Sequence, residues 1–524
     1  MMKLRAIMAA SLLCSIAGVS YLASTASADG DITKVKHIVI VMQENHSFDN
    51  YFGVLPYDPA SPYHAGTCKK NDHACVDGLS CMTDNLGNLK CTNSNDEADG
   101  SSVVSFHDAN YCPGPDLQHN WPGSHAEANL NDPAAALLET LNNGFVVVND
   151  LTEQIDTGGE SATEDDTMGY YNQDDLPFYY ALAETFAIDD RFFCSVVGPT
   201  FPNRSYEMAA TSFGHLTTDE IFPPLPPLVP FPGGYMPITG TIFDLLDAAG
   251  ISWINYFQDL PTSAIFRGDD PTHLRPIGQF FNDSTNGTLP PVSFIDPSFF
   301  PDQSINGGTF ETDEHPPFDI RAGQYFVSTV VNAFRNSTSW KDSVLFLTYD
   351  EHGGFFDHVP PPRAPQGGAL NPDGINPGQC ADLSNPPSST QPGGGLQCTV
   401  SQSDAASICL GFSATGAYPA SCANFDQLGF RVPFIVVSPF AKPHYVSHTV
   451  GDHTSMLAFI ERRFLAKGNG NAKGKAVGGH QSLTLRDLNA DPLLDMFDFV
   501  HSPSLNAPPV PAAPKPVVGE HDCP

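Results

Sequence analysis

The chain has 524 residues, with 59 acidic and 24 basic side chains, a formal net charge of −35 and a pI near 4.5. Such an acidic surface excludes nucleic-acid binding through a general basic patch. Because 41% of the residues are hydrophobic and only 16% are charged, the composition also excludes an intrinsically disordered protein. The length allows one large domain with insertions, or two domains.

The first 28 residues have the features of a secretory signal peptide. The basic start MMKLR precedes an apolar run rich in Ala and Ser, and an A-x-A cleavage pattern ends at Ala28. The alternatives are a membrane anchor, which the small residues of the run disfavour, and a lipoprotein signal at Cys14, which the preceding Leu13 disfavours. No later stretch is long and apolar enough to span a bilayer. We therefore expect a secreted or periplasmic mature chain without a transmembrane segment.

Apolar periodicity predicts strands that alternate with helices along most of the chain. Strands are expected at 35–42, 251–257, 343–349 and 431–439, and helices at 241–250, 324–334 and 452–464, the last capped by Asp452 or Thr454. This alternation predicts an α/β fold with a mainly parallel central sheet that carries helices on both faces.

Two loop-rich segments and a tail interrupt or follow this pattern. Residues 57–118 and 360–425 are rich in Gly, Pro, Ser, Asn and Cys, and we expect them to be insertions in one domain at 29–500. The segment 501–524 is rich in Pro and is expected to be extended rather than packed.

The chain has twelve cysteines, eleven of which follow the signal peptide. Most lie within the two insertions, and their irregular spacing in an exported chain favours disulfides over a zinc site. The odd number predicts at least one free or unexpectedly paired thiol. The spacing fixes neither the connectivity nor the oligomeric state.

Polar side chains gather directly after two of the predicted strands. Glu44 and Asn45 follow the first strand, and Asp350, Glu351 and His352 follow the strand at 343–349. Ligands of an open parallel sheet bind beyond the carboxyl ends of its strands. Three carboxylates and an amide at one edge would repel each other without a cation, so a hard or borderline divalent metal is expected there. Each cluster alone could equally be a capped turn.

A third segment could supply a nucleophile. The stretch VVGPTFPNRSYEMAATS at 196–212 places Thr200 in a turn bracketed by prolines, before a predicted helix. Backbone N–H groups at a helix start suit phosphate oxygens, and a hydroxyl beside a metal can lose its proton and attack phosphorus. Asn203 and Arg204 could hold the non-bridging oxygens, although Arg204 could instead cap or pair structurally.

These segments resemble the bacterial phospholipase C and acid phosphatase A type phosphoesterases, a branch of the alkaline-phosphatase superfamily. The resemblance spans about residues 35–465 and is carried by HIVIVMQENHSFDNYFG (37–53), GPTFPNRSYEMAATS (198–212), DEHPP (313–317) and YDEHGGFFDHVPPP (349–362). Residues 431–442 and 452–464 match as well. The resemblance implies an alkaline-phosphatase-like fold.

The resemblance also implies roles for individual residues. One divalent metal ion (calcium, magnesium, manganese, zinc or iron) would be held by Glu44, Asn45, Asp350 and Glu351, and also touched by the nucleophile Thr200. His119 and His315 would bind phosphate or protonate the leaving oxygen. His352 is a candidate for substrate binding, whereas His46, which stands where many relatives have Arg, and His358 are more simply explained as hydrogen-bonded core residues.

The expected function is metal-dependent hydrolysis of a phosphoric ester through a phosphothreonine at Thr200. Thr at this position favours a phospholipase C acting on a phospholipid, and an acid phosphatase acting on small phosphomonoesters is the alternative. Tyr170, Tyr171 and Trp253 are candidates to contact a choline headgroup. An exported binding protein without catalytic activity would lack a metal ligand or the nucleophile, and none of these is missing here. A sulfatase would need Cys or Ser at position 200, where this sequence has Thr.

Overall fold

The computed structural model describes residues 31–134, 141–156, 166–221, 234–267, 270–300, 311–365, 371–382, 398–466, 476–477, 480–506 and 509–516. The predicted signal peptide and the last eight residues of the tail lie outside these ranges. Within them, no helix combines the length and the hydropathy that crossing a membrane requires.

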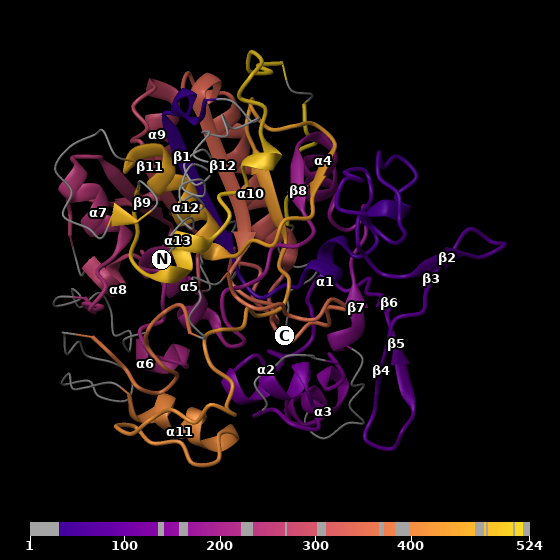
Figure 1. The fold of residues 1–524 in the computed structure, drawn as a ribbon. Coiled ribbons are helices and arrows are strands. Elements are labelled where there is room, and N and C mark those ends of the chain that lie inside the picture. The colour runs from indigo at the N-terminus through magenta and orange to yellow at the C-terminus, as the bar shows by residue number, and fades with distance from the viewer. Residues whose placement is uncertain are drawn as a thin grey trace, which may run out of the picture.

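Eight of the described strands form one central sheet (Figure 1). Their order is β10 (Leu274–Pro276), β9 (Trp253–Phe257), β11 (Val292–Asp296), β1 (His37–Gln43), β12 (Ser343–Tyr349), β13 (Phe434–Val437), β8 (Ala187–Asp189) and β14 (Tyr445–Ser447). Among them every neighbouring pair is parallel, apart from the two pairs that β13 makes. The mainly parallel sheet is therefore confirmed. The chain leaves β12 and enters β13 at the same end of the sheet, with the second insertion between them. Strand β13 is therefore antiparallel to β12.

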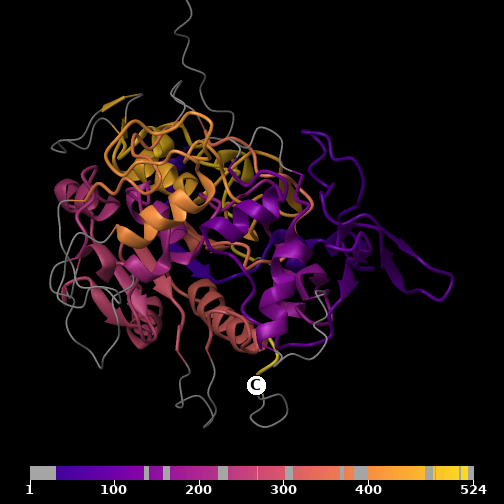
Figure 2. The same cartoon turned by 90° about the horizontal axis from the view of Figure 1, so that it is seen from below.

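Helices cover both faces of the sheet, as predicted (Figures 1 and 2). One group of helices packs together on one side, namely α5 (Thr200–Ala209), α7 (Ile242–Ala249), α12 (His453–Phe464) and α13 (Leu485–Asn489). A second group packs on the other side, namely α4 (Pro177–Thr185), α9 (Ile277–Asn286) and α10 (Ile320–Arg335). The remaining helices lie in the connections: α1 (Phe48–Phe52), α2 (Trp121–Ala128), α3 (Phe145–Asp156), α6 (Thr218–Ile221), α8 (Ala264–Arg267) and α11 (Thr399–Ile408).

Local sequence signals set the ends of the predicted helices. Thr241 and Asp244 form a capping box at the start of α7, and Gly250 ends that helix with a φ of +71°. The Asp452 side chain accepts a hydrogen bond from the Thr454 N–H and caps α12. Helix α10 begins four residues earlier than predicted because Asp319 caps it at that point.

Disulfides tie both insertions, as expected. The bonds Cys68–Cys75 and Cys81–Cys91 lie in the first insertion, and Cys380–Cys398 and Cys409–Cys422 lie in the second. Cys194 is buried and free, which confirms the prediction of an unpaired thiol. Two hairpins of the first insertion project from the body in Figure 1, β2 (Cys81–Thr83) with β3 (Leu89–Cys91) and β4 (Ser94–Asp96) with β5 (Ser102–Val104).

The described part of the tail is extended as expected, and residues 501–506 are mostly exposed, but part of the segment 509–516 is packed. Residues 509–516 have no regular secondary structure, yet Val510 and Ala513 are buried in the main hydrophobic core. These two apolar side chains alternate with prolines that keep the backbone extended, so an extended segment still buries its apolar side. Two short pairings complete the structure: β6 (Phe106–His107) with β7 (Gly169–Tyr170), and β15 (Ala476–Val477) with β16 (His480–Gln481).

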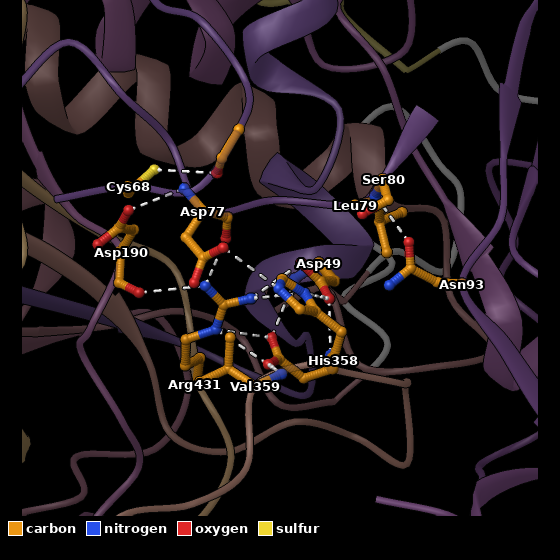
Figure 3. A network of polar contacts seen from close by, with 12 residues as sticks. Asp49, Cys68, Asp77, Leu79, Ser80, Asn93, Asp190, His358, Val359 and Arg431 are labelled. Carbon is orange, nitrogen blue, oxygen red and sulfur yellow. Dashed lines mark hydrogen bonds and ion pairs between the residues drawn. The ribbon is translucent and has the colours of Figure 1, made fainter. Parts of the chain in front are cut away.

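A buried arginine joins the first insertion to the loops after β1 and β12 (Figure 3). The Arg431 guanidinium lies 2.9 Å from both Asp49 Oδ1 and Asp357 Oδ1, and donates a 2.7 Å hydrogen bond to the Asp77 carbonyl of the insertion. Beside it, His358 Nδ1 lies 2.6 Å from Asp49 Oδ2, and His358 Nε2 lies 3.5 Å from Asp77 Oδ1. The chain positions that this network joins are far apart in sequence, so it fixes tertiary structure.

The charge of His358 should make stability depend on pH. Burial opposes the imidazolium, but Asp49 and Asp77 outweigh it and raise the pKa of His358 from 6.5 to about 9. The cation therefore contributes stability below pH 6.5, and this contribution is lost as the pH rises through about 9. We expect the difference in melting temperature between wild type and His358→Gln to shrink over that interval. A difference that stays constant from pH 6 to pH 10 would contradict this account.

Candidate active site

The carboxyl ends of β1 and β12 lie side by side. Their parallel register pairs Gln43 with Tyr349, so Glu44 and Asp350 are the first residues beyond two adjacent strand ends. The Asn45 N–H donates a hydrogen bond of 3.2 Å to Asp350 Oδ1. All four predicted metal ligands, including Glu351, are no more than 4% exposed. The structure therefore brings the two acidic clusters together.

The two loops beyond these strands approach each other closely. Asn45 has a φ of +61°, which is rare for a residue other than glycine. Gly353, with a φ of +64°, faces it so closely that a Cβ would lie 2.2 Å from the Asn45 carbonyl oxygen. A side chain at position 353 would push the loops apart, so this glycine permits the approach of the two ligand pairs.

Arg204 neutralises part of this acidic group from within the protein. Its guanidinium is fully buried, with Nη2 3.0 Å from Glu44 Oε1 and Nε 3.4 Å from Asp350 Oδ2. It also donates to the Met42 and Gln43 carbonyls at 3.4 and 3.3 Å. Arg204 therefore forms the structural ion pair that was the alternative, while its Nη1 makes no hydrogen bond within the described residues, so a contact with a phosphate oxygen stays a prediction.

Asn203 is likewise occupied by the protein. Its Oδ1 accepts from the Val196 N–H at 3.0 Å, and its Nδ2 donates to the Gly198 carbonyl at 2.8 Å. These bonds shape the turn that leads into α5. The predicted contact with phosphate is therefore replaced by a role in positioning Thr200, the first residue of that helix.

Thr200 is the first residue of α5, where the N-cap residue Pro199 provides no side-chain cap and the Phe201 N–H donates to Thr218 Oγ1 at 3.4 Å. Thr200 is 6% exposed and lies four residues before Arg204. Residues at this spacing share one helix face, so Thr200 lies one turn before the side chain that contacts both ligand loops. This geometry is compatible with the predicted nucleophile.

The two predicted catalytic histidines lie together at the accessible side of the ligand pairs. The rings of His119 and His315 are 6.1 Å apart, and their side chains are 15% and 24% exposed. His119 Nε2 is 3.9 Å from Glu351 Oε1. Asp116 Oδ1 lies 3.5 Å from His119 Nδ1 and 3.9 Å from His315 Nε2. Sequence reasoning missed Asp116, although an acid three residues before His119 was a visible signal.

Neighbouring carboxylates favour the charged form of both imidazoles. Burial opposes the charge, but Glu351 and Asp116 raise the pKa of His119 to about 9. Against the same penalty, Asp116 and Glu44 raise the pKa of His315 above its usual value. Imidazoles that reach solvent beside carboxylates are suited to donate protons to a leaving oxygen.

Two other histidines act on neighbouring side chains. His352 is fully buried, with Nε2 2.8 Å from Glu127 Oε2 and Nδ1 3.1 Å from Glu351 Oε2, so it orients Glu351 instead of reaching a substrate. His46 Nδ1 lies 2.7 Å from Asn50 Oδ1 and its ring is surrounded by aromatic rings, as expected for a core residue. Glu127 has no counterpart among the residues predicted from the sequence.

The candidate headgroup residues are buried. Tyr170, Tyr171 and Trp253 are no more than 3% exposed, and Trp253 stacks on His273 with ring centroids 3.9 Å apart. Their side chains take part in core packing, and a contact with a choline group stays a prediction.

The ligand pairs supply the type of donor atom that a hard divalent cation takes. Asn45 Oδ1, Asp350 Oδ2 and Glu351 Oε1 are buried and accept no hydrogen bond within the described part of the chain. Burial, with the nearby Glu44 carboxylate, also raises the pKa of Asp350 to about 8. Unsatisfied buried oxygens are costly, and hard cations prefer oxygen ligands, so a metal would satisfy this set.

Four groups of His, Cys, Asp and Glu among the described residues have their ligand atoms within 4.8 Å of one another, and Glu44, Asp350 and Glu351 do not form one of them. Most of the four groups already have partners. Two of them contain Cys75 or Cys380, whose sulfurs are in disulfides. The group around Asp49 contains the Arg431 guanidinium, and the Asp116 group is the histidine pair described above.

Comparisons with known proteins agree with this geometry. Phospholipase C A of Mycobacterium tuberculosis is 30% identical over 477 residues, which cover 83% of this chain and 74% of the relative. Phospholipase C B of the same organism is 29% identical over 482 residues, with the same coverage of 83% and 74%. Non-specific phospholipase C4 of Arabidopsis thaliana is 28% identical over 478 residues, covering 86% and 72%.

Among solved structures, Ps i-CgsB aligns over 54% of this chain and 65% of its own, with 10% identity and a TM-score of 0.27, too low to bear on the fold.

The family model agrees with the relatives named above. The model of the phosphoesterase family matches residues 35–466 and so includes every residue of the site. The chain belongs to the phosphoesterase family and is a hydrolase that acts on phosphoric ester bonds.

Proposed function

We propose that this protein is an exported, metal-dependent phosphodiesterase of the phospholipase C type. The observation that carries the proposal is the convergence of buried, unsatisfied oxygens on Asn45, Asp350 and Glu351 beside two accessible histidines. The names of the relatives support a phospholipid as the substrate. The predicted signal peptide and the disulfides of both insertions support export.

In this proposal Glu44, Asn45, Asp350 and Glu351 hold one divalent metal ion. A cation bound there would lower the pKa of a nearby hydroxyl and offset the negative charge on the phosphoryl oxygens. The ligands themselves are kept in place by other residues, because Arg204 pairs with two of them and His352 with a third.

Thr200 is the proposed nucleophile. Its hydroxyl loses its proton to solvent, the resulting oxygen attacks phosphorus in line with the leaving alcohol, and the bond between phosphorus and the alcohol oxygen breaks. His315 or His119 donates a proton to that oxygen, while Asp116 stabilises the charge of both imidazoles. Water then hydrolyses the phosphothreonine and releases the phosphorylated headgroup.

A second candidate, an acid phosphatase, shares every residue of this mechanism. The two enzymes differ in whether the pocket admits a second ester group, and the named phospholipases C among the relatives favour the diester. An inactive binding protein would have no need for a nucleophile beside intact ligand pairs.

Removing the nucleophile separates chemistry from binding. Thr200→Val replaces the hydroxyl with a methyl of similar size, so we expect phosphodiesterase activity to fall by more than about a thousandfold. Because Thr200 is also expected to touch the metal, Mn²⁺ affinity measured by calorimetry should fall, but far less than activity, since the four other proposed ligands remain. The matched control is Thr185→Val, because that hydroxyl donates only to a backbone carbonyl at the end of α4 among the described residues. Retained activity in Thr200→Val with metal bound would exclude the covalent route.

The substrate class is tested by comparing two esters with and without metal. We expect hydrolysis of phosphatidylcholine to exceed that of 4-nitrophenyl phosphate, to be lost after chelation, and to return when Mn²⁺ is added. Hydrolysis of the monoester alone would assign the protein as an acid phosphatase. Binding of Mn²⁺ without hydrolysis of either ester would favour the inactive binding protein.

A further inference from the structure

Beneath the site, the Glu314 side chain accepts four hydrogen bonds. Tyr51 and Tyr349 each donate to Oε2 at 2.6 Å, Tyr179 donates to Oε1, and Gln43 Nε2 lies 3.3 Å from Oε1. Glu314 is 1% exposed. A buried carboxylate with a full set of donors is held in one position, because moving it would break several bonds at once.

These donors connect the segments that carry the site. Gln43 directly precedes the first ligand pair, Tyr349 directly precedes the second, and Glu314 itself directly precedes His315. Successive side chains of a strand point to opposite faces. The side chains that contact Glu314 therefore lie on one side of the strand ends. The residues that follow them, which carry the proposed chemistry, lie on the other side.

The backbone around Glu314 is held as firmly as its side chain. The Glu44 N–H donates to the Asp313 carbonyl at 2.8 Å, and His46 Nε2 lies 2.9 Å from the Glu314 carbonyl oxygen. Glu314 has a φ of +77°, in the left-handed region. Such a conformation is unfavourable for a residue with a side chain and persists where surrounding contacts impose it.

Helix α10 also makes room for this carboxylate. Gly323 lies in the interior of that helix, where glycine is less favourable than alanine. A Cβ on Gly323 would lie 2.1 Å from Glu314 Cγ. The side chain of Glu314 thus fits against α10 only because position 323 lacks a side chain.

We propose that Glu314 is a positioning residue that holds His315 and both ligand pairs in one fixed arrangement. This inference rests on the proposed function, since it concerns the same site. A merely structural carboxylate would affect stability alone. A positioning residue must also affect metal affinity and the protonation of the leaving group.

The most selective test is Gly323→Ala, because it crowds Glu314 without removing any polar group. We expect it to weaken Mn²⁺ binding and to lower kcat on phosphatidylcholine, each by about tenfold or more, as changes around metal ligands typically do. KM should change much less than kcat. The matched control is Gly278→Ala in α9, where a Cβ meets no atom within 4 Å.

A second test uses the leaving group. In Glu314→Gln, turnover of phosphatidylcholine should fall more than turnover of 4-nitrophenyl phosphorylcholine, because nitrophenolate leaves without a proton from His315. The control is Tyr256→Phe, which removes a buried tyrosine hydroxyl that donates to Asp283 at 2.8 Å, away from the site. It should behave as wild type in both assays.

The outcomes separate this inference from the proposed function. The inference is overturned if Gly323→Ala and Glu314→Gln bind Mn²⁺ and turn over both diesters as wild type does, whether or not their melting temperatures fall. If Glu314→Gln does not fold, Gly323→Ala and Tyr179→Phe decide by the same measurements. If the wild type binds Mn²⁺ but hydrolyses neither diester, the proposed function fails, and the Mn²⁺ affinities alone decide whether Glu314 positions the ligands.

Discussion

The in-register parallel pairing of β1 with β12 is the constraint on which the site depends. It brings two strand ends, more than three hundred residues apart in sequence, to adjacent positions. Glu44 and Asp350 are the first residues after these two strands, before either segment can turn away from the other. Their proximity is thus a consequence of backbone hydrogen bonding, and the repulsion between the carboxylates is a cost that other groups must offset.

Buried cations offset this cost on the protein side. Arg204 lies against Glu44 and Asp350, and His352 lies between Glu351 and Glu127. Farther along the same two loops, Arg431 pairs with an aspartate from each. The loops are therefore fixed at both ends, yet three oxygens of the ligand pairs still accept no hydrogen bond within the described chain. A bound metal would supply the interaction that these three oxygens lack.

The sequence was sufficient to predict the parts of this arrangement that are local. Continuous apolar runs predicted β1 and β12, and the polar residues directly after them predicted which side chains would meet. Thr241, Gly250 and Asp452 gave the ends of two helices because caps act within a few residues.

What the sequence could not provide depends on long-range contacts. Asn203 and Arg204 have side chains suited to phosphate, and only the fold shows that the backbone and the carboxylates occupy them. Asp116 and Glu127 belong to the site because they contact histidines from distant segments, His315 and His352 respectively. The reversed direction of β13 followed from where the second insertion ends, which no local pattern records.

The central claim is that one divalent cation binds between the loops that follow β1 and β12. Anomalous diffraction from crystals soaked in Mn²⁺ tests it most directly. The account predicts a strong peak within coordination distance of Asn45 Oδ1, Asp350 Oδ2 and Glu351 Oε1, with the Thr200 hydroxyl next to it. A peak between Asp116 and the two histidines alone, or Thr200 turned away from the ion, would contradict it.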